Sequence, residues 1–177
     1  MPITNNNVKC IIRTGRLEDA AAILAIENAV ISERDYLITL YEELNKTSVA
    51  QKREWIQELL ENKKETLLVA ELNGQVVGWI VFYSQKRKRL SHTGSFTMML
   101  RKKFRGMGIG KMLVEALLEW SKKNPLIEKV SLGVFSTNYR AISLYKNMGF
   151  IEEGRKIKEF KLNDNEYIDD ILMYKFV

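Results

Sequence analysis

The chain has 177 residues, of which 46% are hydrophobic and two are proline, so it can bury one core and does not have the composition of a disordered protein. We expect a single domain over residues 1–177 in the cytoplasm, because no apolar run approaches the roughly 20 residues of a membrane span and the first residues do not resemble a secretory signal. The formal charge of +6 favours an anionic ligand, but it does not choose among nucleic acid, lipid headgroups and a phosphorylated cofactor.

Cysteine and histidine are too scarce for a metal centre or a disulfide framework. The chain has one residue of each type, Cys10 and His92, whereas a metal site built from such ligands needs several of them. Cys10 lies in an early apolar segment, so we expect it to pack in the core and not to act as a nucleophile. A single cysteine agrees with a reducing compartment. We therefore predict no metal site.

The first part of the chain is predicted to form one strand followed by two helices. Alternation and helical spacing of apolar residues place a strand at Val8–Arg13, a helix over Leu17–Ile26 and a second helix over Val49–Asn62. Thr47 or Ser48 supplies the N-cap of the second helix. The piece between the helices, Asp35–Leu44, has no pattern that assigns it.

A hairpin and two further strand–helix alternations are predicted for the rest of the chain. The pair Asn73-Gly74 accepts the positive φ angles of a tight turn, so it joins two β-rich runs. Pro125 ends the helix that starts at Gly110. The predicted elements are strands at Thr66–Leu72, Gln75–Ser84, Thr93–Arg101 and Lys129–Phe135, a helix at Asn138–Asn147 closed by Gly149, and strands at Ile151–Phe160 and Tyr167–Tyr174 joined by the turn Asn163-Asp164-Asn165.

The element order predicts an α/β or α+β fold in which helices cover one sheet. The order is β-α-α-β-β-β-α-β-α-β-β. Hairpins require antiparallel pairs, whereas the strand–helix–strand unit from Thr93 to Phe135 favours a parallel crossover. We therefore predict a mixed sheet.

A glycine-rich turn precedes the helix that starts at Gly110. Where glycines lie between a strand and a helix, free backbone N–H groups and the helix dipole favour a phosphate. The glycines remove side chains that would block close approach, and nearby basic side chains add positive charge. The turn is Arg105-Gly106-Met107-Gly108-Ile109-Gly110, and the neighbouring basic residues are Lys102, Lys103 and Lys111.

Two common phosphate-binding motifs do not fit this turn. A P-loop needs four residues between its first glycine and Gly-Lys, followed by Ser or Thr. Here three residues separate Gly106 from Gly110-Lys111, and Met112 follows. A dinucleotide fingerprint needs Gly-x-Gly-x-x-Gly in the first strand–helix unit, but this turn has Leu113 at the last glycine position and lies late in the chain. A glycine-rich connection that holds no ligand is the remaining alternative.

Two motifs in register resemble the GNAT superfamily of acetyltransferases. Arg105-x-x-Gly108-x-Gly110 is similar to the signature whose backbone amides hold the pyrophosphate of coenzyme A, and the segment Asn138–Phe150 looks like the Asn-x-x-Ala-x-x-Leu-Tyr-x-x-x-Gly-Phe pattern of the same family. The likeness covers essentially Ile11–Val177. It implies a mostly antiparallel central sheet of about seven strands with helices on both faces. From the residues alone, Asn138–Gly149 is also explained as a capped amphipathic helix.

The resemblance implies an N-acetyltransferase that uses acetyl-CoA as acyl donor and transfers the acetyl group directly to a primary amine, with no metal. Tyr145 is then the catalytic residue, because a positioned phenol can give a proton to the departing thiolate. The strand Phe96–Leu100 is expected to splay from its neighbour and to expose backbone N–H groups. The residues implied to bind the donor are Met98, Met99, Leu100, Arg105, Gly106, Met107, Gly108, Ile109, Gly110, Lys111 and Asn138.

The general base and the acceptor stay open at this stage. Many family members carry a glutamate as general base on the strand where this chain has Ser95, Phe96 and Thr97. The general base of this chain is therefore a water chain or one of three other side chains, Glu27, Glu71 and His92. The acceptor is a small-molecule or peptide amine. Its pocket is expected to draw on Tyr36, Tyr41, Glu42, Glu43 and Tyr167.

Two other functions are weighed against the enzyme. A GNAT-fold protein that binds acyl-CoA without turnover would act as a sensor. A basic module would bind nucleic acid through Lys86–Arg89 and Lys102–Arg105, but interspersed acidic residues and the lack of a nucleic-acid motif argue against it. A membrane partner is not expected, and a homodimer stays open.

Overall fold

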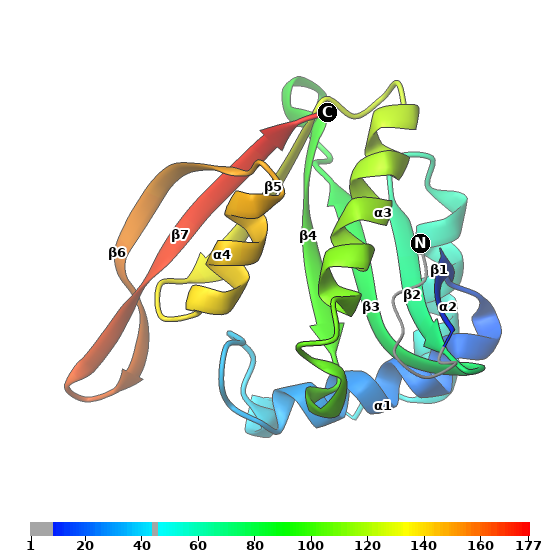
Figure 1. The fold of residues 1–177 in the computed structure, drawn as a ribbon, viewed down its shortest axis with the longest axis horizontal. Helices are drawn as coiled ribbons and strands as arrows, with labels where there is room; N and C mark the ends of the chain where they lie inside the picture. Colours follow the sequence, from blue (N-terminus) through cyan, green and yellow to red (C-terminus); the bar gives the residue numbers. More distant parts are fainter. Residues whose placement is uncertain (1–8, 44–45) are drawn as a thin grey trace.

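The computed structural model describes residues 9–43 and 46–177, and their strands form one sheet in the order β1-β2-β3-β4-β5-β7-β6 (Figure 1). The strands are β1 (Cys10–Thr14), β2 (Thr66–Leu72), β3 (Gln75–Ser84), β4 (Thr93–Leu100), β5 (Lys129–Phe135), β6 (Ile151–Asn163) and β7 (Glu166–Phe176). The helices are α1 (Ala20–Ile31), α2 (Val49–Glu61), α3 (Ile109–Lys123) and α4 (Tyr139–Asn147), with 3-10 turns at Leu17–Asp19, Tyr41–Glu43, Lys88–Leu90 and Lys102–Phe104.

The predicted element order is confirmed, with small shifts at the ends. The first strand starts at Cys10, and Val8 of the predicted strand lies outside the described residues. Ser48 is the N-cap of α2. Its hydroxyl accepts a hydrogen bond from Gln51 N at 3.1 Å, and Gln51 Oε1 accepts one from Ser48 N at 2.8 Å. This reciprocal box satisfies two amides that the first turn leaves free.

The predicted hairpin and the predicted crossover are both present. β2 pairs antiparallel with β3, and the turn residues Asn73 and Gly74 take the positive φ angles of 51° and 81° that a tight hairpin requires. β4 and β5 are parallel neighbours joined through α3. Their pairing runs only from Thr93 opposite Lys129 to Ser95 opposite Ser131, so the two strands part beyond Ser95, as the resemblance implied.

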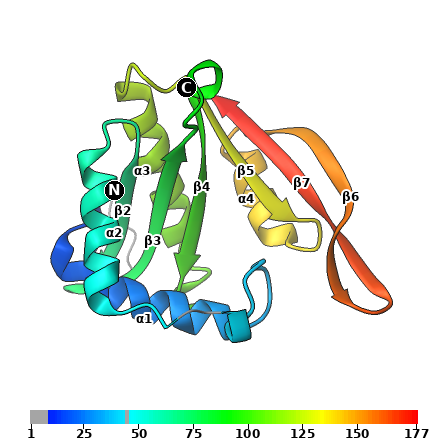
Figure 2. The same ribbon diagram turned by 180° about the vertical axis from the view of Figure 1, so that it is seen from behind.

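Helices cover both faces of the sheet. α3 and α4 lie on the face seen in Figure 1, and α1 and α2 lie on the face seen in Figure 2. Each face has its own apolar cluster: Leu113 and Leu117 of α3 pack in one, and Ile23 of α1 and Ile56 of α2 pack in the other. The predicted class, a mixed and mostly antiparallel sheet between helices, is confirmed. Cys10 is half-buried at the edge of the first cluster.

The last two strands form a long hairpin that extends beyond the rest of the sheet (Figure 2). β6 continues three residues past the predicted end at Phe160, and its pairing with β7 shifts register at three places. The turn itself is Asp164-Asn165, where Asn165 N donates to Asn163 Oδ1 at 3.1 Å. Within residues 9–43 and 46–177, no helix is both long and apolar enough to span a membrane.

Candidate active site

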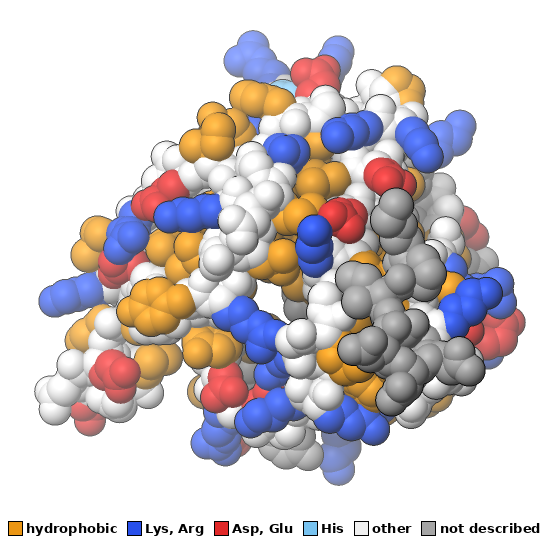
Figure 3. Space-filling model, in the orientation of Figure 1, with side chains coloured by type: hydrophobic (Ala, Val, Ile, Leu, Met, Phe, Trp, Pro, Cys, Tyr) orange, Lys and Arg blue, Asp and Glu red, His pale blue; other side chains and the backbone are white. Residues whose placement is uncertain are grey.

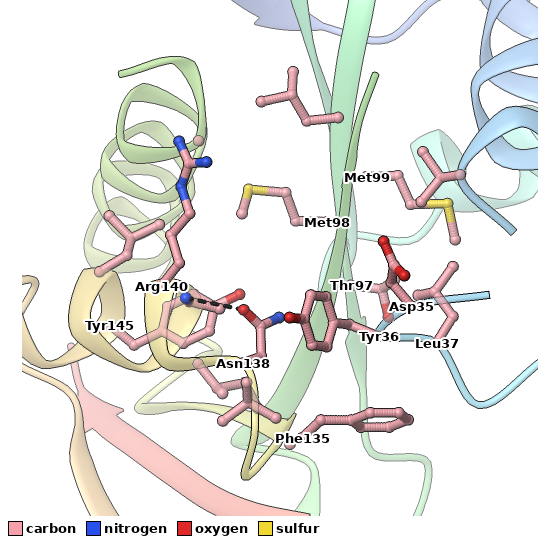
Figure 4. Close-up of a pocket in the computed structure, with 18 of the residues that line it drawn as sticks. Asp35, Tyr36, Leu37, Thr97, Met98, Met99, Phe135, Asn138, Arg140 and Tyr145 are labelled. Atoms are coloured by element: carbon pink, nitrogen blue, oxygen red, sulfur yellow. Dashed lines mark hydrogen bonds between the residues drawn. The ribbon is translucent and has the colours of Figure 1, made fainter. Parts of the chain in front are cut away.

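A cleft of about 1070 Å³ opens where β4 and β5 part. Figure 3 shows a hollow in the middle of the molecule with Lys and Arg side chains on its rim. One wall comes from α4 and β5, the opposite wall from the end of α1 and the loop that follows it, and the glycine-rich turn closes one end. In Figure 4, Tyr145, Arg140 and Asn138 project from the α4 side, while Asp35, Tyr36 and Leu37 approach from the loop.

The glycine-rich turn has the backbone of an anion-binding site. Gly106 and Gly108 have φ angles of 88° and 81°, in a region that side chains rarely adopt, and Gly108 is the N-cap of α3. The first capping bond of the helix runs from Met112 N to Gly108 O at 3.1 Å. The amides of the three residues before Met112 therefore lie outside the helical ladder, at the positive end of its dipole.

One of the predicted basic groups at this turn is paired, and a second arginine reaches the turn. We expect Arg105 and three neighbouring lysines to supply positive charge there, and of these lysines Lys111 lines the cleft. The Arg105 guanidinium, however, donates to both carboxylate oxygens of Glu33, at 2.6 and 3.1 Å, and to Leu100 O at 3.1 Å. Glu33 offsets its charge because a bidentate ion pair satisfies both partners. Arg140 instead reaches the turn, where its Nη2 lies 3.1 Å from the position of a Cβ on Gly106.

The free edge of β4 presents different side chains to the two faces of the sheet. Phe96, Met98 and Leu100 pack with the cluster beneath α3 and α4, whereas Met99 belongs to the cluster beneath α1 and α2. Because side chains alternate along a strand, Thr97 faces the same way as Met99. The backbone of β4 therefore passes between the two sides of the cleft, with one edge unpaired by β5 beyond Ser95.

Tyr145 is buried in the wall formed by α4. Its ring packs edge-to-face on Phe96 and Phe150, with ring centroids 5.7 and 5.9 Å apart. Burial disfavours the phenolate and raises the pKa of Tyr145 to about 12. The side chain lines the cleft, so it carries a proton there at neutral pH.

Asn138 has a structural role and also lines the cleft. It is the N-cap of α4, and its Oδ1 accepts from Ala141 N at 3.2 Å, which is the bond dashed in Figure 4. The interpretation of Asn138–Gly149 as a capped helix is therefore confirmed: Gly149 takes a φ of 82° directly after the helix.

The predicted donor-binding residues are mostly brought together. The side chains of Met107 and Ile109 do not line the cleft, because Met107 is 49% exposed and the Ile109 side chain is buried in the core, although the Ile109 amide is one of the three outside the helical ladder. The predicted residues that line the cleft are Met98, Met99, Leu100, Arg105, Gly106, Gly108, Gly110, Lys111, Asn138 and Tyr145.

Two of the three base candidates lie away from the cleft. Glu71 is paired with Arg13 at 2.7 Å in the outer part of the sheet, and His92 precedes β4, where its carbonyl accepts from two backbone amides. Glu27 does line the cleft, but its carboxylate holds the buried Lys52 ammonium at 2.6 Å. None of the three candidates therefore both lines the cleft and has a side chain that is not already paired.

The expected acceptor residues are also only partly in place. Tyr36 lines the cleft from the loop after α1. Glu42 is paired with Arg34, Glu43 accepts from Leu40 N at 2.9 Å, and Tyr167 lies beside Lys158 and Lys161 on the outer hairpin. Tyr41 belongs to the short turn Tyr41–Glu43, and its side chain lies outside the described part.

Sequence reasoning missed several side chains that line the cleft, among them Asp35, Phe135, Arg140, Phe160 and Asp170. Asp170 had a signal in the sequence, because it is a charged residue between buried Ile168 and Ile171 in an otherwise alternating strand. Asp35 lies in the segment that no pattern assigned. Among the described residues, no group of three His, Cys, Asp or Glu side chains is arranged to hold a metal ion.

Comparison with known proteins gives one consistent result. Residues 32–150 match the family model described as "Acetyltransferase (GNAT) family". The chain is 30% identical over 119 residues to the L-amino acid N-acetyltransferase AaaT of Escherichia coli K12, covering 67% of this chain and 73% of that protein. The matched range includes the glycine-rich turn and the segment Asn138–Phe150.

Two solved structures show the same fold. An acetyltransferase of the GNAT family from Streptococcus pneumoniae superposes with a TM-score of 0.90 at 25% identity, covering 96% of this chain and 100% of that one. The YncA protein of Salmonella typhimurium, solved with its cofactor acetyl-CoA, gives a TM-score of 0.84 at 19% identity, covering 95% of this chain and 94% of that one.

Proposed function

This chain belongs to the GNAT family of acetyltransferases and is an acyltransferase; we propose that it moves the acetyl group of acetyl-CoA directly onto a primary amine while both substrates are bound. The observation that carries this proposal is the turn at the start of α3, whose free amides and positive-φ glycines open into the same cleft as Tyr145. The two features are needed together, because one binds a diphosphate and the other meets the departing sulfur.

Coenzyme A fits the chemistry of this site. Two phosphate groups need several N–H donors and little bulk. The free amides of Ile109, Gly110 and Lys111 provide the donors at the helix N-terminus, and Gly106, Gly108 and Gly110 leave the space. Arg140 and Lys111 add positive charge around them. The free edge of β4 offers backbone amides to the amide groups of the pantetheine arm and to the acetyl carbonyl.

The chain's own residues then have separate tasks in the transfer. Backbone amides of β4 polarise the acetyl carbonyl, so that a neutral amine can attack it. The Tyr145 phenol hydrogen-bonds to the sulfur and gives it a proton as the C–S bond breaks. The loop at 33–39 covers the opposite wall and places Tyr36 over the acceptor side.

An acyl-CoA sensor without turnover is the second candidate. It is favoured by one observation: none of the three expected bases is free in the cleft, since Glu27 is held by Lys52 at 2.6 Å. A sensor would bind coenzyme A and acetylate no amine. A homodimer, in either case, stays a prediction.

Gly108→Glu tests the site of donor binding. A carboxylate at the helix N-terminus would occupy the phosphate position and repel the diphosphate, so we expect coenzyme A to bind at least about 100-fold more weakly, or about 2.8 kcal/mol. Isothermal titration measures the dissociation constant. Gly154→Glu is the matched control, because it adds the same charge on β6, where a side chain meets nothing within 4 Å. Equal affinity in the two variants would place the donor elsewhere.

A thiol-release assay separates the enzyme from the sensor. Acetyl-CoA is supplied with a panel of peptides, amino acids, polyamines and aminoglycosides, and the released thiol is followed with time. We expect turnover with at least one class of amine. Binding of coenzyme A with no turnover across the panel would favour the sensor.

A further inference from the structure

Asp170 is a buried carboxylate in the wall of the cleft. It lies on β7, is 9% exposed and lines the cleft beside Gly133 of β5. A Cβ on Gly133 would stand only 2.7 Å from Asp170 Oδ1. The carboxylate therefore occupies the space above β5 that any other residue at position 133 would fill.

The carboxylate faces the side of the sheet away from Tyr145. Leu132 and Val134 belong to the cluster beneath α3 and α4, as does Ile171. Because side chains alternate along both strands, Gly133 and Asp170 point to the opposite face, which α1 and its following loop cover. Asp170 thus lies on the acceptor side of the splayed strands, and Tyr145 lies on the donor side.

The groups around Asp170 leave its charge poorly compensated. Lys156 of β6 is the nearest cation, at 3.8 Å, and its side chain is 51% exposed. Glu159, also on β6, is a repelling neighbour. The backbone of Val134 in β5 hydrogen-bonds to the carboxylate and, like Lys156, lowers its pKa. Burial is the largest influence and raises the pKa of Asp170 above its ordinary value.

The wall of the cleft formed by α1 and its following loop also carries carboxylates. Asp35 lines the cleft from the loop after α1, and Glu27 and Glu33 also line it, each held by its own cation. The donor end carries Arg140 and Lys111 instead. Positive side chains therefore gather at the end suited to phosphates, whereas Asp35 and Asp170 are the carboxylates at the wall suited to a cation.

Phe135 and Phe160 flank the carboxylate as a stacked pair, with ring centroids 4.4 Å apart, and both line the cleft. Aromatic faces beside a carboxylate form a favourable surface for an ammonium group. A buried carboxylate without a close cation destabilises a fold. Proteins keep such destabilising groups mainly at functional sites. An asparagine would fill the same space without the charge.

We propose that Asp170 receives the protonated amine of the acceptor and takes up its proton, which makes the acceptor a cationic primary amine. This inference rests on the proposed acetyltransferase function. The ammonium gives one proton to Asp170 and becomes a neutral amine. Its nitrogen then forms the C–N bond to the acetyl carbon, and the C–S bond breaks.

The protons balance over one turnover. The nitrogen loses a second proton as the amide forms, and the leaving sulfur gains one from Tyr145, which is restored by that second proton. Asp170 releases its proton to solvent as product leaves. The sum is one ammonium and one thioester converted to one amide, one thiol and one proton.

Asp170→Asn tests the assignment, with Asp169→Asn as the matched control. Asp169 is the next residue of the same strand and faces outward, where it accepts from Lys158 N at 2.8 Å and pairs with Arg155 at 3.4 Å. We expect Asp170→Asn to lower kcat/KM for the best amine of the panel about 100-fold or more at pH 7, and Asp169→Asn to leave it within twofold.

Two further readouts separate a proton acceptor from a structural residue. In Asp170→Asn, kcat/KM should become proportional to the fraction of unprotonated amine, because the variant cannot deprotonate a bound ammonium. Its affinity for coenzyme A should stay within twofold of the wild type. The melting temperature should rise at pH 8, because the ionised form of a carboxyl with a raised pKa destabilises the fold above that pKa.

The outcomes decide between the two proposals. Wild-type protein that binds coenzyme A and acetylates no amine removes the proposed function and the role of Asp170 with it. Wild-type turnover that Asp170→Asn retains, with an unchanged pH profile, overturns the role of Asp170 alone. A lower melting temperature in Asp170→Asn also overturns it, because the carboxylate would then hold the fold together.

Discussion

Tyr145 and Asp170 show how burial sets the chemistry of single residues in this cleft. Both are buried, and in both cases burial is the largest influence on the pKa, which it raises. For a phenol, this keeps the proton in place for donation; for a carboxyl, it makes the anion a stronger base. The same physical effect therefore suits the opposite tasks that we propose for the two residues.

At the residue scale we predict that Tyr145→Phe lowers kcat about 100-fold and leaves the affinity for coenzyme A within twofold, because only the proton donor is lost. Stopped-flow thiol release and isothermal titration measure the two quantities. Since the pKa of Tyr145 is about 12, its ionisation should give no falling limb in the wild-type pH profile below pH 10. A kcat that survives the substitution would assign the proton to water.

At the scale of elements, the end of α4 depends on a residue far along the chain. Gly149 follows the helix with a φ of 82°, and Lys175 of β7 donates to Met148 O at 2.9 Å. The Lys175 ammonium occupies the space that a Cβ on Gly149 would need. A cation at a helix C-terminus is stabilising, so β7 fixes the helix that carries Tyr145 and Asn138.

Gly149→Ala tests this connection. The alanine must adopt a left-handed φ and displace Lys175, so we expect a loss of about 2 kcal/mol in the free energy of unfolding. Urea denaturation measures it. Gly154→Ala serves as control, because a Cβ there meets nothing within 4 Å. If both variants were equally stable, the left-handed cap and the lysine would not hold the helix in place.

At the scale of the whole molecule, one ion network ties the start of the chain to the sheet. Arg13 of β1 pairs with Asp19 at 2.8 Å and with Glu71 of β2 at 2.7 Å. Asp19 is 7% exposed. Burial raises its pKa, but the bonds from Arg13 and from Arg16 N outweigh burial, and the net pKa is lowered below 3.8. The ionised carboxylate is thus favoured in the fold.

The sign of that shift predicts an acid-sensitive contribution to stability. It is fully present above the unfolded pKa of 3.8 and is lost as the pH falls through the lower folded pKa. Arg13→Ala leaves two carboxylates without their partner, so we expect it to cost about 3 kcal/mol at pH 7. Urea denaturation at pH 7 and near pH 2 should show the difference shrinking on acidification; a constant difference would contradict the ion network.

Much of this molecule follows from residues that are close in the sequence. The hairpin at Asn73-Gly74, the Ser48 cap and the helix that begins after Gly108 depend on turn chemistry, capping and apolar periodicity. These are local preferences that a few neighbouring residues decide. The element order and the glycine-rich turn were therefore predictable, and the two spaced motifs indicated the family.

Which side chains meet in the cleft was decided by the tertiary structure. Arg105 forms an ion pair with Glu33, 72 positions away in the sequence, and Lys52 forms one with Glu27, 25 positions away. The first pair neutralises the charge of Arg105, and the second occupies the carboxylate of Glu27, a candidate general base. Arg140 of α4 and Asp170 of β7 line the site instead. No local pattern fixes such partners, because they depend on how the sheet splays and which strands become neighbours, and those contacts form only when the whole chain packs.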